Sequence, residues 1–178
     1  MAGKYNIVTT GEGVSATREM MITFVNTGTA EAPVWAAMGA KVTSSSIEYD
    51  WNIKSGTDIL GSAYTNAKTA QMSQSFGGNE IIAGDAVMNH LVNLAVVQKN
   101  AAKLVNQDCL IGHLYLQDES GKSFAERYPA SAVIPTTIGG EGGAALVTDI
   151  DVTYGGARVT GTATKTADGV TFTPDVTV

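Results

Sequence analysis

Few residues of this sequence belong to the types that carry out catalysis or hold metal ions. The 178 residues include one cysteine, Cys109, and two histidines, His90 and His113. None of these is spaced as a pair of zinc ligands, so a zinc site would need carboxylates to complete it. Cys109 could act as a nucleophile beside a histidine, but it leads into the apolar residues Leu110 and Ile111, where a free cysteine commonly packs as a small hydrophobic side chain. We therefore expect no catalytic residue, cofactor or metal ion, with His90 a polar helix residue and His113 a sheet residue.

Two glycine-containing segments resemble phosphate-binding loops without meeting their requirements. Gly121-Lys122-Ser123 matches the end of such a loop, but the motif needs a glycine five positions before Gly121, where Leu116 stands. The run 139–143 could bind an anion through its backbone N–H groups, yet Glu141 lies in its middle and a strand follows it. We interpret the first segment as part of a turn and the second as a flexible connection.

Two pairs of acidic residues are spaced two apart: Glu48 with Asp50, and Asp149 with Asp151. On a strand, each pair shares one face, which superficially resembles the paired carboxylates of glycoside hydrolases. No sequence feature supplies the apolar pocket that would raise the pKa of one carboxyl group. The pattern therefore favours a solvated row in an isolated domain, or the lining of a channel in a closed ring of subunits.

The first acidic pair lies in a segment of strict alternation. Residues 47–53 read Ile-Glu-Tyr-Asp-Trp-Asn-Ile, which predicts a strand that is buried on one face only. The residues expected to face the core are Ile47, Tyr49, Trp51 and Ile53. Trp51 is accordingly expected inside the protein and not on a ligand-binding platform with Trp35 and Tyr115.

Other segments repeat this apolar-in, polar-out plan. Strands are expected at 20–25, 34–38, 68–76, 110–117, 123–135 and 146–154, with a closing hairpin made of 158–164 and 170–178 that turns near Asp168-Gly169. Between them, apolar residues at helical spacing predict one helix at about 85–99. Asp85 suits the N-terminus of this helix, and Lys99 and Lys103 suit its C-terminus.

This order of elements predicts a mainly β protein, a β-sandwich or partial barrel with one flanking α-helix. Residues 1–18 have little periodicity and are expected to form an N-terminal arm, followed by a single domain over 19–178. The turn-rich segment 54–66 is expected to be a long projecting loop. Loops of this length tend to be functional or to be ordered by a partner.

Composition excludes several classes of partner. The net charge is −6 and only 16% of the residues are charged, so a basic nucleic-acid-binding surface and docking on an anionic membrane are disfavoured. The low charged fraction suits wide contacts between subunits. The start Met-Ala-Gly-Lys-Tyr-Asn lacks the features of a secretory signal, and no apolar run is long enough to cross a bilayer. We expect a soluble protein that folds in the cytoplasm.

The order of several segments resembles that of the major tail proteins, the tail tube subunits of long-tailed bacteriophages of the siphovirus type. The segments that carry the resemblance are 20–28, 33–39, 46–51, 58–61, the central helix, Ala125-Glu126-Arg127-Tyr128, 139–143 and 149–156. None of them is a catalytic signature. The resemblance spans nearly the whole chain and rests on the order of these segments.

The resemblance implies a structural virion protein that is made in the host cytoplasm and assembles as hexameric rings. The rings would stack into a tube whose wall is a continuous β-barrel, through which DNA passes without specific binding. It also implies the tape measure, tail terminator and tail tip proteins as partners. Glu48, Asp50, Asp149 and Asp151 would face the lumen, where their charge would keep DNA from adhering.

The candidates for contacts between rings are the N-terminal arm and the projecting loop. In the loop, the residues singled out are Lys54, Asp58, Ile59, Leu60 and Tyr64. Two alternatives stay open at this point. One is a monomeric β-sandwich that serves as a binding module of a cell-surface or carbohydrate-active protein, and the other is the tube subunit of a contractile tail-like particle.

Overall fold

The computed structural model describes residues 4–166 and 169–175, and it confirms a mainly β fold with a flanking helical segment. The strands are β1 (Asn6–Ile7), β2 (Met21–Asn26), β3 (Trp35–Ala37), β4 (Ile47–Asp50), β5 (Lys54–Thr57), β6 (Ala63–Asn66), β7 (Gln71–Glu80), β8 (Gln107–Gln117), β9 (Ser123–Gly139), β10 (Val147–Thr153), β11 (Val159–Thr166) and β12 (Gly169–Pro174). A short 3-10 helix, η1 (Arg18–Met20), precedes β2. The helical segment consists of α1 (Ala86–Val92), a π-helical turn (Asn93–Val97) and α2 (Ala101–Leu104).

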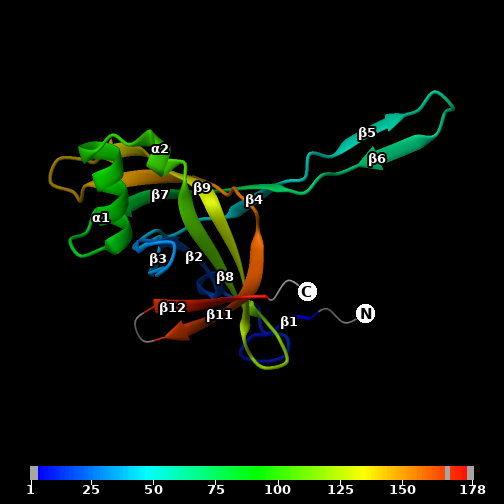
Figure 1. Ribbon diagram of the computed structural model, residues 1–178, viewed down its shortest axis with the longest axis horizontal. Helices are drawn as coiled ribbons and strands as arrows, with labels where there is room; N and C mark the ends of the chain where they lie inside the picture. Colours follow the sequence, from blue (N-terminus) through cyan, green and yellow to red (C-terminus); the bar gives the residue numbers. More distant parts are fainter. Residues whose placement is uncertain (1–3, 167–168, 176–178) are drawn as a thin grey trace.

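The strands follow the order β3-β2-β8-β9-β10-β7-β4, and every pair is antiparallel. The long strand β9 belongs to two layers. Residues 123–131 pair with β8, and 123–127 also pair with β11, whereas 132–139 pair with β10. The second half of β9 therefore forms a four-stranded sheet with β10, β7 and β4, which the helical segment flanks (Figure 1).

The core lies between this four-stranded sheet, the helical segment and the strands β2 and β8. Its buried members include Phe76 from β7, Leu91 from α1, Ile111 from β8 and Ile150 from β10. A smaller cluster around Trp35 and Leu110 packs under the β11–β12 hairpin. The core side of β10 follows the predicted alternation, since Thr148, Ile150, Val152 and Tyr154 are all buried.

The helix begins where the sequence predicts but is not continuous to residue 99. The Asp85 carboxylate accepts a hydrogen bond from the N–H of Met88 at 3.0 Å, which caps α1. A π-helical turn follows α1, and Lys99 adopts a positive φ of 49°, which ends the helical path before α2 starts at Ala101.

For the single chain, the predicted burial of three residues in the segment 47–53 is wrong. The strand ends at Asp50, since Asn52 has a positive φ of 44° and turns the backbone. Tyr49, Trp51 and Ile53 are exposed, with half of Trp51 accessible to solvent. Within the strand, Tyr49 lies on the same side as Ile47, but no element of the described chain covers that side beyond Ile47.

The segment 54–66 is a hairpin and not a loop without strands. β5 and β6 pair with each other alone and extend away from the body (Figure 1). At the C-terminal end of the chain, β11 and β12 form the expected closing hairpin, and the predicted turn residue Asp168 lies outside the described residues. The N-terminal segment contributes β1, which pairs with the end of β8.

Candidate channel and assembly surfaces

The outer side of the four-stranded sheet is polar on β4, β7 and β10 and carries all four acidic residues that the sequence singled out, while β9 adds Ala132, Ile134 and Thr137 to the same side. Its members, which we call the polar face, are Glu48 and Asp50 of β4, Gln71, Ser73 and Ser75 of β7, and Asp149 and Asp151 of β10. Glu48 lies opposite Ser73, and Ser75 lies opposite Asp151, so the acidic residues of separate strands share one side. Their role as a channel lining stays a prediction.

Hydrogen bonds hold two of these carboxylates in place. Asp149 accepts hydrogen bonds from the N–H of Gly78 and the hydroxyl of Thr137, both at 2.8 Å, and these bonds lower its pKa below the usual value. Asp151 accepts a hydrogen bond from the hydroxyl of Ser75 at 2.7 Å. Both carboxylates of β10 are therefore fixed in position on the polar face.

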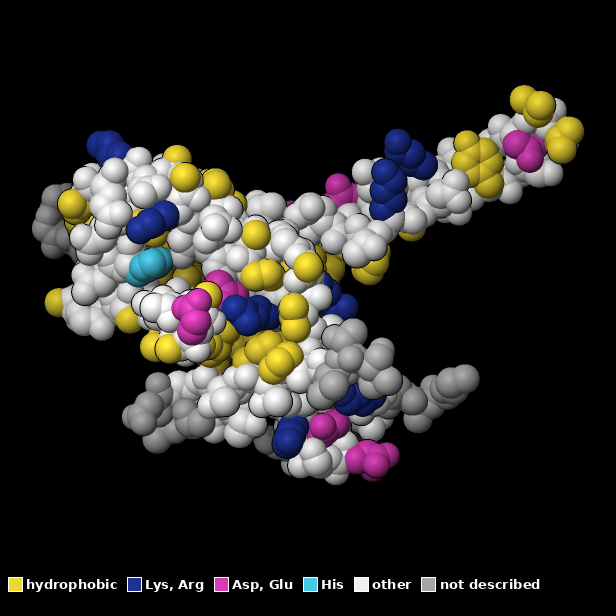
Figure 2. Space-filling view, in the orientation of Figure 1, with side chains coloured by type: hydrophobic (Ala, Val, Ile, Leu, Met, Phe, Trp, Pro, Cys, Tyr) yellow, Lys and Arg dark blue, Asp and Glu magenta, His cyan; other side chains and the backbone are white. Residues whose placement is uncertain are grey.

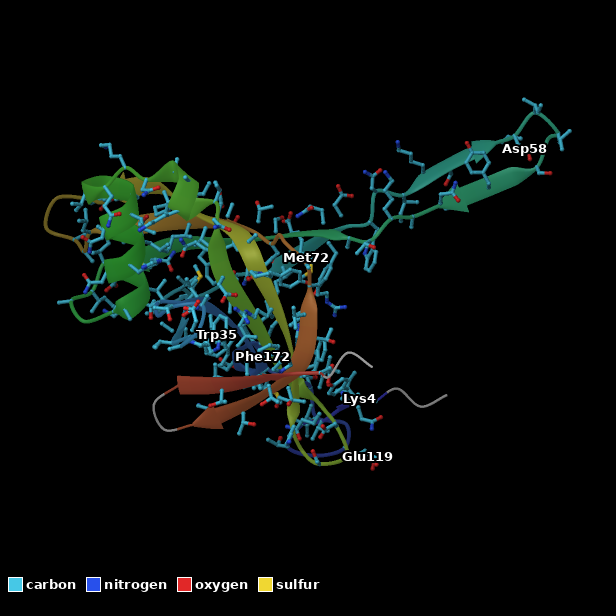
Figure 3. All side chains as sticks on the ribbon, in the orientation of Figure 1. Lys4, Trp35, Asp58, Met72, Glu119 and Phe172 are labelled. Atoms are coloured by element: carbon cyan, nitrogen blue, oxygen red, sulfur yellow. The ribbon has the colours of Figure 1, made fainter. Side chains whose placement is uncertain are left out.

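The projecting hairpin ends in a well-defined turn with two bare aliphatic side chains. The Asp58 carboxylate accepts hydrogen bonds from the N–H groups of Leu60 and Ser62, both at 2.9 Å, which fixes the turn (Figure 3). Ile59 is fully exposed and Leu60 is 85% exposed. Hydrophobic side chains are accordingly visible at the end of the hairpin (Figure 2). An isolated two-stranded hairpin is marginally stable in water, so such a tip gains most from a partner.

One contact inside the hairpin needs a glycine. Gly56 lies opposite Tyr64, and a Cβ added to Gly56 would stand 2.8 Å from the Tyr64 hydroxyl. The Tyr64 ring can therefore lie across the backbone of β5 only because residue 56 has no side chain. Lys54, at the base of β5, is exposed.

A second uncovered apolar surface lies where the hairpin joins the body. Tyr49 and Trp51 stack with their ring centroids 6.1 Å apart and an angle of 14° between the ring planes. Ile53, in the same segment, is 64% exposed, and we call Tyr49, Trp51 and Ile53 together the aromatic stripe. Trp35, by contrast, is buried. Exposed stacked aromatic side chains are typical of surfaces that bind a partner or a ligand.

The structure also contains a buried polar cluster that sequence reasoning missed. Glu126 of β9 accepts hydrogen bonds from His113 Nε2 (2.9 Å), Arg158 Nε (2.6 Å) and the Tyr128 hydroxyl (3.0 Å). Burial opposes the ionisation of Glu126 by desolvation, but the bonds from His113 and Arg158 outweigh it and hold its pKa below the usual value. The cluster ties β8, β9 and the start of β11 together, and no nucleophile is part of it.

The other residues of types that could do chemistry have structural partners. The His90 ring lies 2.8 Å from the side-chain oxygen of Gln107, and Cys109 is fully buried, which raises the pKa of its thiol to about 12. The turn at 118–122 is closed by the Asp118 carboxylate, which accepts from the N–H groups of Ser120 and Lys122. Within residues 4–166 and 169–175, no three His, Cys, Asp or Glu side chains form a group that could hold a metal ion.

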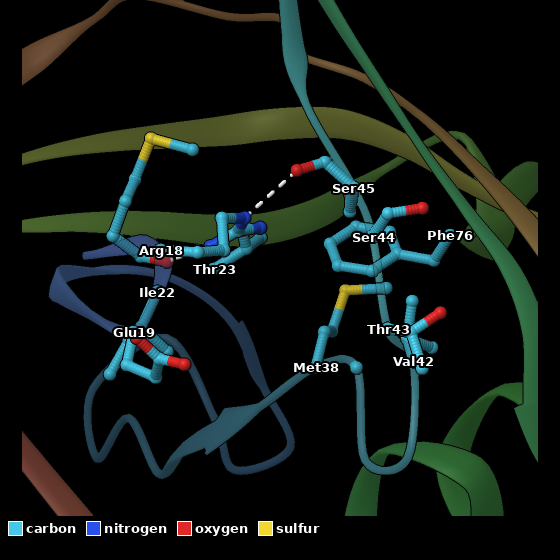
Figure 4. A pocket seen from close by; sticks show the side chains of 12 residues that line it. Arg18, Glu19, Ile22, Thr23, Met38, Val42, Thr43, Ser44, Ser45 and Phe76 are labelled. Atoms are coloured by element: carbon cyan, nitrogen blue, oxygen red, sulfur yellow. Dashed lines mark hydrogen bonds between the residues drawn. The ribbon is translucent and has the colours of Figure 1, made fainter.

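A pocket of about 340 Å³ opens between η1, β2 and the segment that leads into β4 (Figure 4). Met38 and Phe76 line it with apolar side chains, and Arg18 spans it by donating a hydrogen bond from Nε to the backbone oxygen of Ser45 at 2.8 Å. Its only carboxylate is Glu19, and no histidine or cysteine lines it. The pocket therefore lacks an acid–base pair.

No helix in the described part of the chain is long and apolar enough to cross a membrane.

Comparison with known proteins gave matches to solved structures only, since no protein-family model and no curated protein matches the sequence. One match is the sheath–tube complex of an extracellular contractile injection system, with 12% identity, 85% of this chain and 94% of that chain covered, and a TM-score of 0.48. Another is the sheath/tube terminator of such a system, with 11% identity, 84% and 99% coverage, and a TM-score of 0.49.

A third similar structure is the tube-terminating cap of the anti-feeding prophage. It shares 14% identity with this chain, covers 88% of this chain and 97% of its own, and has a TM-score of 0.46. Neither the identities nor the TM-scores assign this chain to a family.

Proposed function

We propose that this chain is a structural subunit that polymerises with itself into stacked hexameric rings and forms the tail tube of a bacteriophage. The observation that carries the proposal is the two-sided sheet of β9, β10, β7 and β4. One side packs on the core, and the other is an exposed polar face with acidic residues on two strands. The order of the segments that resemble the major tail proteins supports the same function.

The polar face would line the channel of the tube. Glu48, Asp50, Asp149 and Asp151 would give the wall a negative charge, which repels the phosphate backbone of DNA. Serine and glutamine side chains between them offer hydrogen bonds to water and no positive charge to hold a phosphate. DNA could then move through the tube during delivery into a host cell without adhering to its wall.

The projecting hairpin and the N-terminal arm would join successive rings. Ile59 and Leu60 contact little of their own chain, and Lys54 and Tyr64 extend the accessible surface toward the base of the hairpin. Burying the two aliphatic side chains against another ring would contribute about 1.5–3 kcal/mol for each. The tape measure, tail terminator and tail tip proteins would then engage the tube, and the finished protein would reside in the virion.

Electron microscopy of the purified protein over a concentration series, with sizing of the soluble fraction, tests this function. We expect rings or hollow tubes whose amount rises with concentration. A protein that stays monomeric both alone and with a tail initiator would contradict the proposal. The presence or absence of a sheath around native particles would distinguish a contractile tail from a non-contractile one.

The exposed aromatic stripe favours a second candidate, a carbohydrate-binding module. Stacked exposed aromatic rings such as Tyr49 and Trp51 can form a platform for a sugar ring. Electrophoresis of the protein through gels that contain soluble polysaccharides tests this candidate. Retardation that is lost in Trp51→Ala, with no polymer formed, would favour the binding module over the tube subunit.

A further inference from the structure

The tip of the projecting hairpin combines two bare aliphatic side chains with a carboxylate that keeps one oxygen free. Ile59 is fully exposed and Leu60 is 85% exposed. Both hydrogen bonds that fix the turn, from the N–H groups of Leu60 and Ser62, end on Oδ1 of Asp58. Within the described chain, no hydrogen bond ends on Oδ2 of this carboxylate. The tip therefore presents an acceptor oxygen directly beside an apolar surface.

The pocket between η1, β2 and the segment that leads into β4 has the complementary chemistry. Met38 and Phe76 line it and are buried, so its floor is apolar. Arg18 lies across it (Figure 4), and among the described residues this guanidinium forms no ion pair, not even with Glu19, which lines the same pocket. The volume of about 340 Å³ is similar to that of pockets that hold small ligands, about 300–1,000 Å³. It can admit aliphatic side chains.

The pocket and the hairpin lie at opposite ends of β4. Residues 43–45 line the pocket and lead into β4 at Ile47, whereas β4 ends at Asp50 and the hairpin follows with β5 from Lys54. Figure 1 accordingly shows the hairpin extending from the body on the side away from β2 and β3. The tip therefore does not reach the pocket of its own chain. A contact between the two surfaces joins copies head to tail and can repeat along a stack.

We propose that this pocket is the docking site for the hairpin tip of a second copy of this chain. Ile59 and Leu60 enter the apolar part of the pocket, and Oδ2 of Asp58 accepts a hydrogen bond from the Arg18 guanidinium. The proposal rests on the function proposed above, which assigns the hairpin to contacts between rings, and adds the surface that receives it.

The second copy is the occupant that the two surfaces favour. Both expose apolar area to water in the monomer, so their contact is favoured by the hydrophobic effect. The carboxylate of Asp58 and the guanidinium of Arg18 have opposite charges, and such a pair fixes the register of a contact more than it adds affinity. The chain therefore carries both halves of the contact at its two ends of β4.

Cross-linking tests the contact without altering either aliphatic side chain. Ser62→Cys lies at the hairpin tip and Ser44→Cys at the edge of the pocket, and both positions are exposed (Figure 4). An equimolar mixture of these two variants is allowed to assemble and is treated with a short bismaleimide. The native Cys109 is fully buried and does not compete. The control mixture combines Ser62→Cys with Glu119→Cys, in the exposed turn after β8 (Figure 3).

We expect a band of linked dimers from the first mixture that is at least 10-fold stronger than the bands from the control mixture and from each variant alone. Normal tubes without this excess of linked dimers would overturn the docking site and leave the proposed function standing. The absence of assembly in the native protein would overturn both.

A charge at the edge of the pocket tests the receiving surface. Ser44→Glu adds a carboxylate to the pocket that holds Arg18, where it repels Asp58 of the second copy. Electron microscopy should show single rings and a mean tube length at least 10-fold shorter. The control Ala145→Glu changes the net charge equally in an exposed loop and should keep the native length. Both variants should fold, because both positions are exposed. Tubes of native length from Ser44→Glu would overturn the docking site.

Discussion

At the scale of single residues, the strongest local arrangement is the cluster around Glu126. Its carboxylate is buried and is shared by His113, Tyr128 and the half-exposed Arg158. Nothing in the sequence pattern indicates this cluster, since only Tyr128 is close to Glu126 in the sequence, while His113 and Arg158 lie 13 and 32 positions away. A pattern based on neighbouring residues cannot detect such a network, because the fold alone brings its members together.

The cluster predicts a loss of stability in acid. The pKa of Glu126 is lower in the folded protein than its ordinary value of 4.5, so its contribution is complete above that value and is lost as the pH falls through the folded pKa. Urea denaturation should show a free energy of unfolding that falls as the pH is lowered below 4.5.

The matched variant is Glu126→Gln. It should lower the free energy of unfolding by about 1–3 kcal/mol at pH 7 and should reduce the loss seen in acid. A variant that follows the native protein at every pH would show that the charge of Glu126 does not stabilise the fold.

The exposure of Trp51 in the monomer leads us to expect a change in tryptophan fluorescence on assembly. In the monomer it is half exposed, while Trp35 is buried and lies close to the Arg127 guanidinium. Iodide should therefore quench part of the tryptophan fluorescence of the monomer and much less of it once the protein has assembled. Equal quenching in sized monomers and in purified tubes would mean that Trp51 stays exposed in the polymer.

At the scale of elements, the alternation of apolar and polar residues predicts which residues share a face of a strand. It does not predict whether that face is buried. On β10 the residues Asp149 and Asp151 point out and Ile150 points in, as expected, because the core of the same chain covers that strand. On β4 the same pattern is present, but Tyr49 is exposed. The sequence specifies which residues share a face, and only the surrounding elements or another chain decide whether that face is buried.

The sequence predicts a loop at 54–66, because apolar and polar residues do not alternate regularly there and turn-forming residues are frequent. The strands of the hairpin pair only with each other, and its most apolar residues lie at the tip and not along a buried face. A strand is predicted from the alternation between a buried and an exposed side, and this hairpin has no side that faces the core. Its projection from the body was therefore easier to anticipate than its strands.

The tip of the hairpin can be tested without disturbing the fold. The double variant Ile59→Ser/Leu60→Ser should change the free energy of unfolding of the monomer by no more than about 0.5 kcal/mol, because neither side chain is buried. Tube length measured by electron microscopy should fall sharply.

The matched control is Val97→Ser at the end of the π-helical turn, which also removes an exposed aliphatic side chain. Its tubes should keep the native length. Tubes of native length from the double variant would contradict the role of the tip between rings.

At the scale of the whole molecule, the central feature is that acidic residues lie on one side of the four-stranded sheet and the apolar core lies on the other. The chain has a net charge of −6, and the polar face places four of its acidic residues on one sheet. The sequence predicted the fold class and the common face of these residues. It could not predict the open edges of β4 and β9, because strand order depends on pairings between distant segments.

A change in the charge of the polar face should change what the polymer encloses. Particles of Glu48→Lys/Asp151→Lys assembled with short duplex DNA should retain DNA that a nuclease cannot digest, because lysine side chains on the channel wall attract phosphates. Native particles should retain little.

The control Glu119→Lys/Glu141→Lys changes the net charge equally on exposed loops, and its DNA should stay accessible to the nuclease. Equal protection by both double variants would show that net charge, and not the position of the polar face, determines DNA retention.

The most direct test of the whole account is a cryo-electron microscopy reconstruction of the assembled protein. The account predicts a hollow tube of stacked rings in which Glu48, Asp50, Asp149 and Asp151 line the channel and the helical segment lies outside it. A tube whose channel is lined by other residues would contradict it, and so would a protein that forms no polymer under any condition.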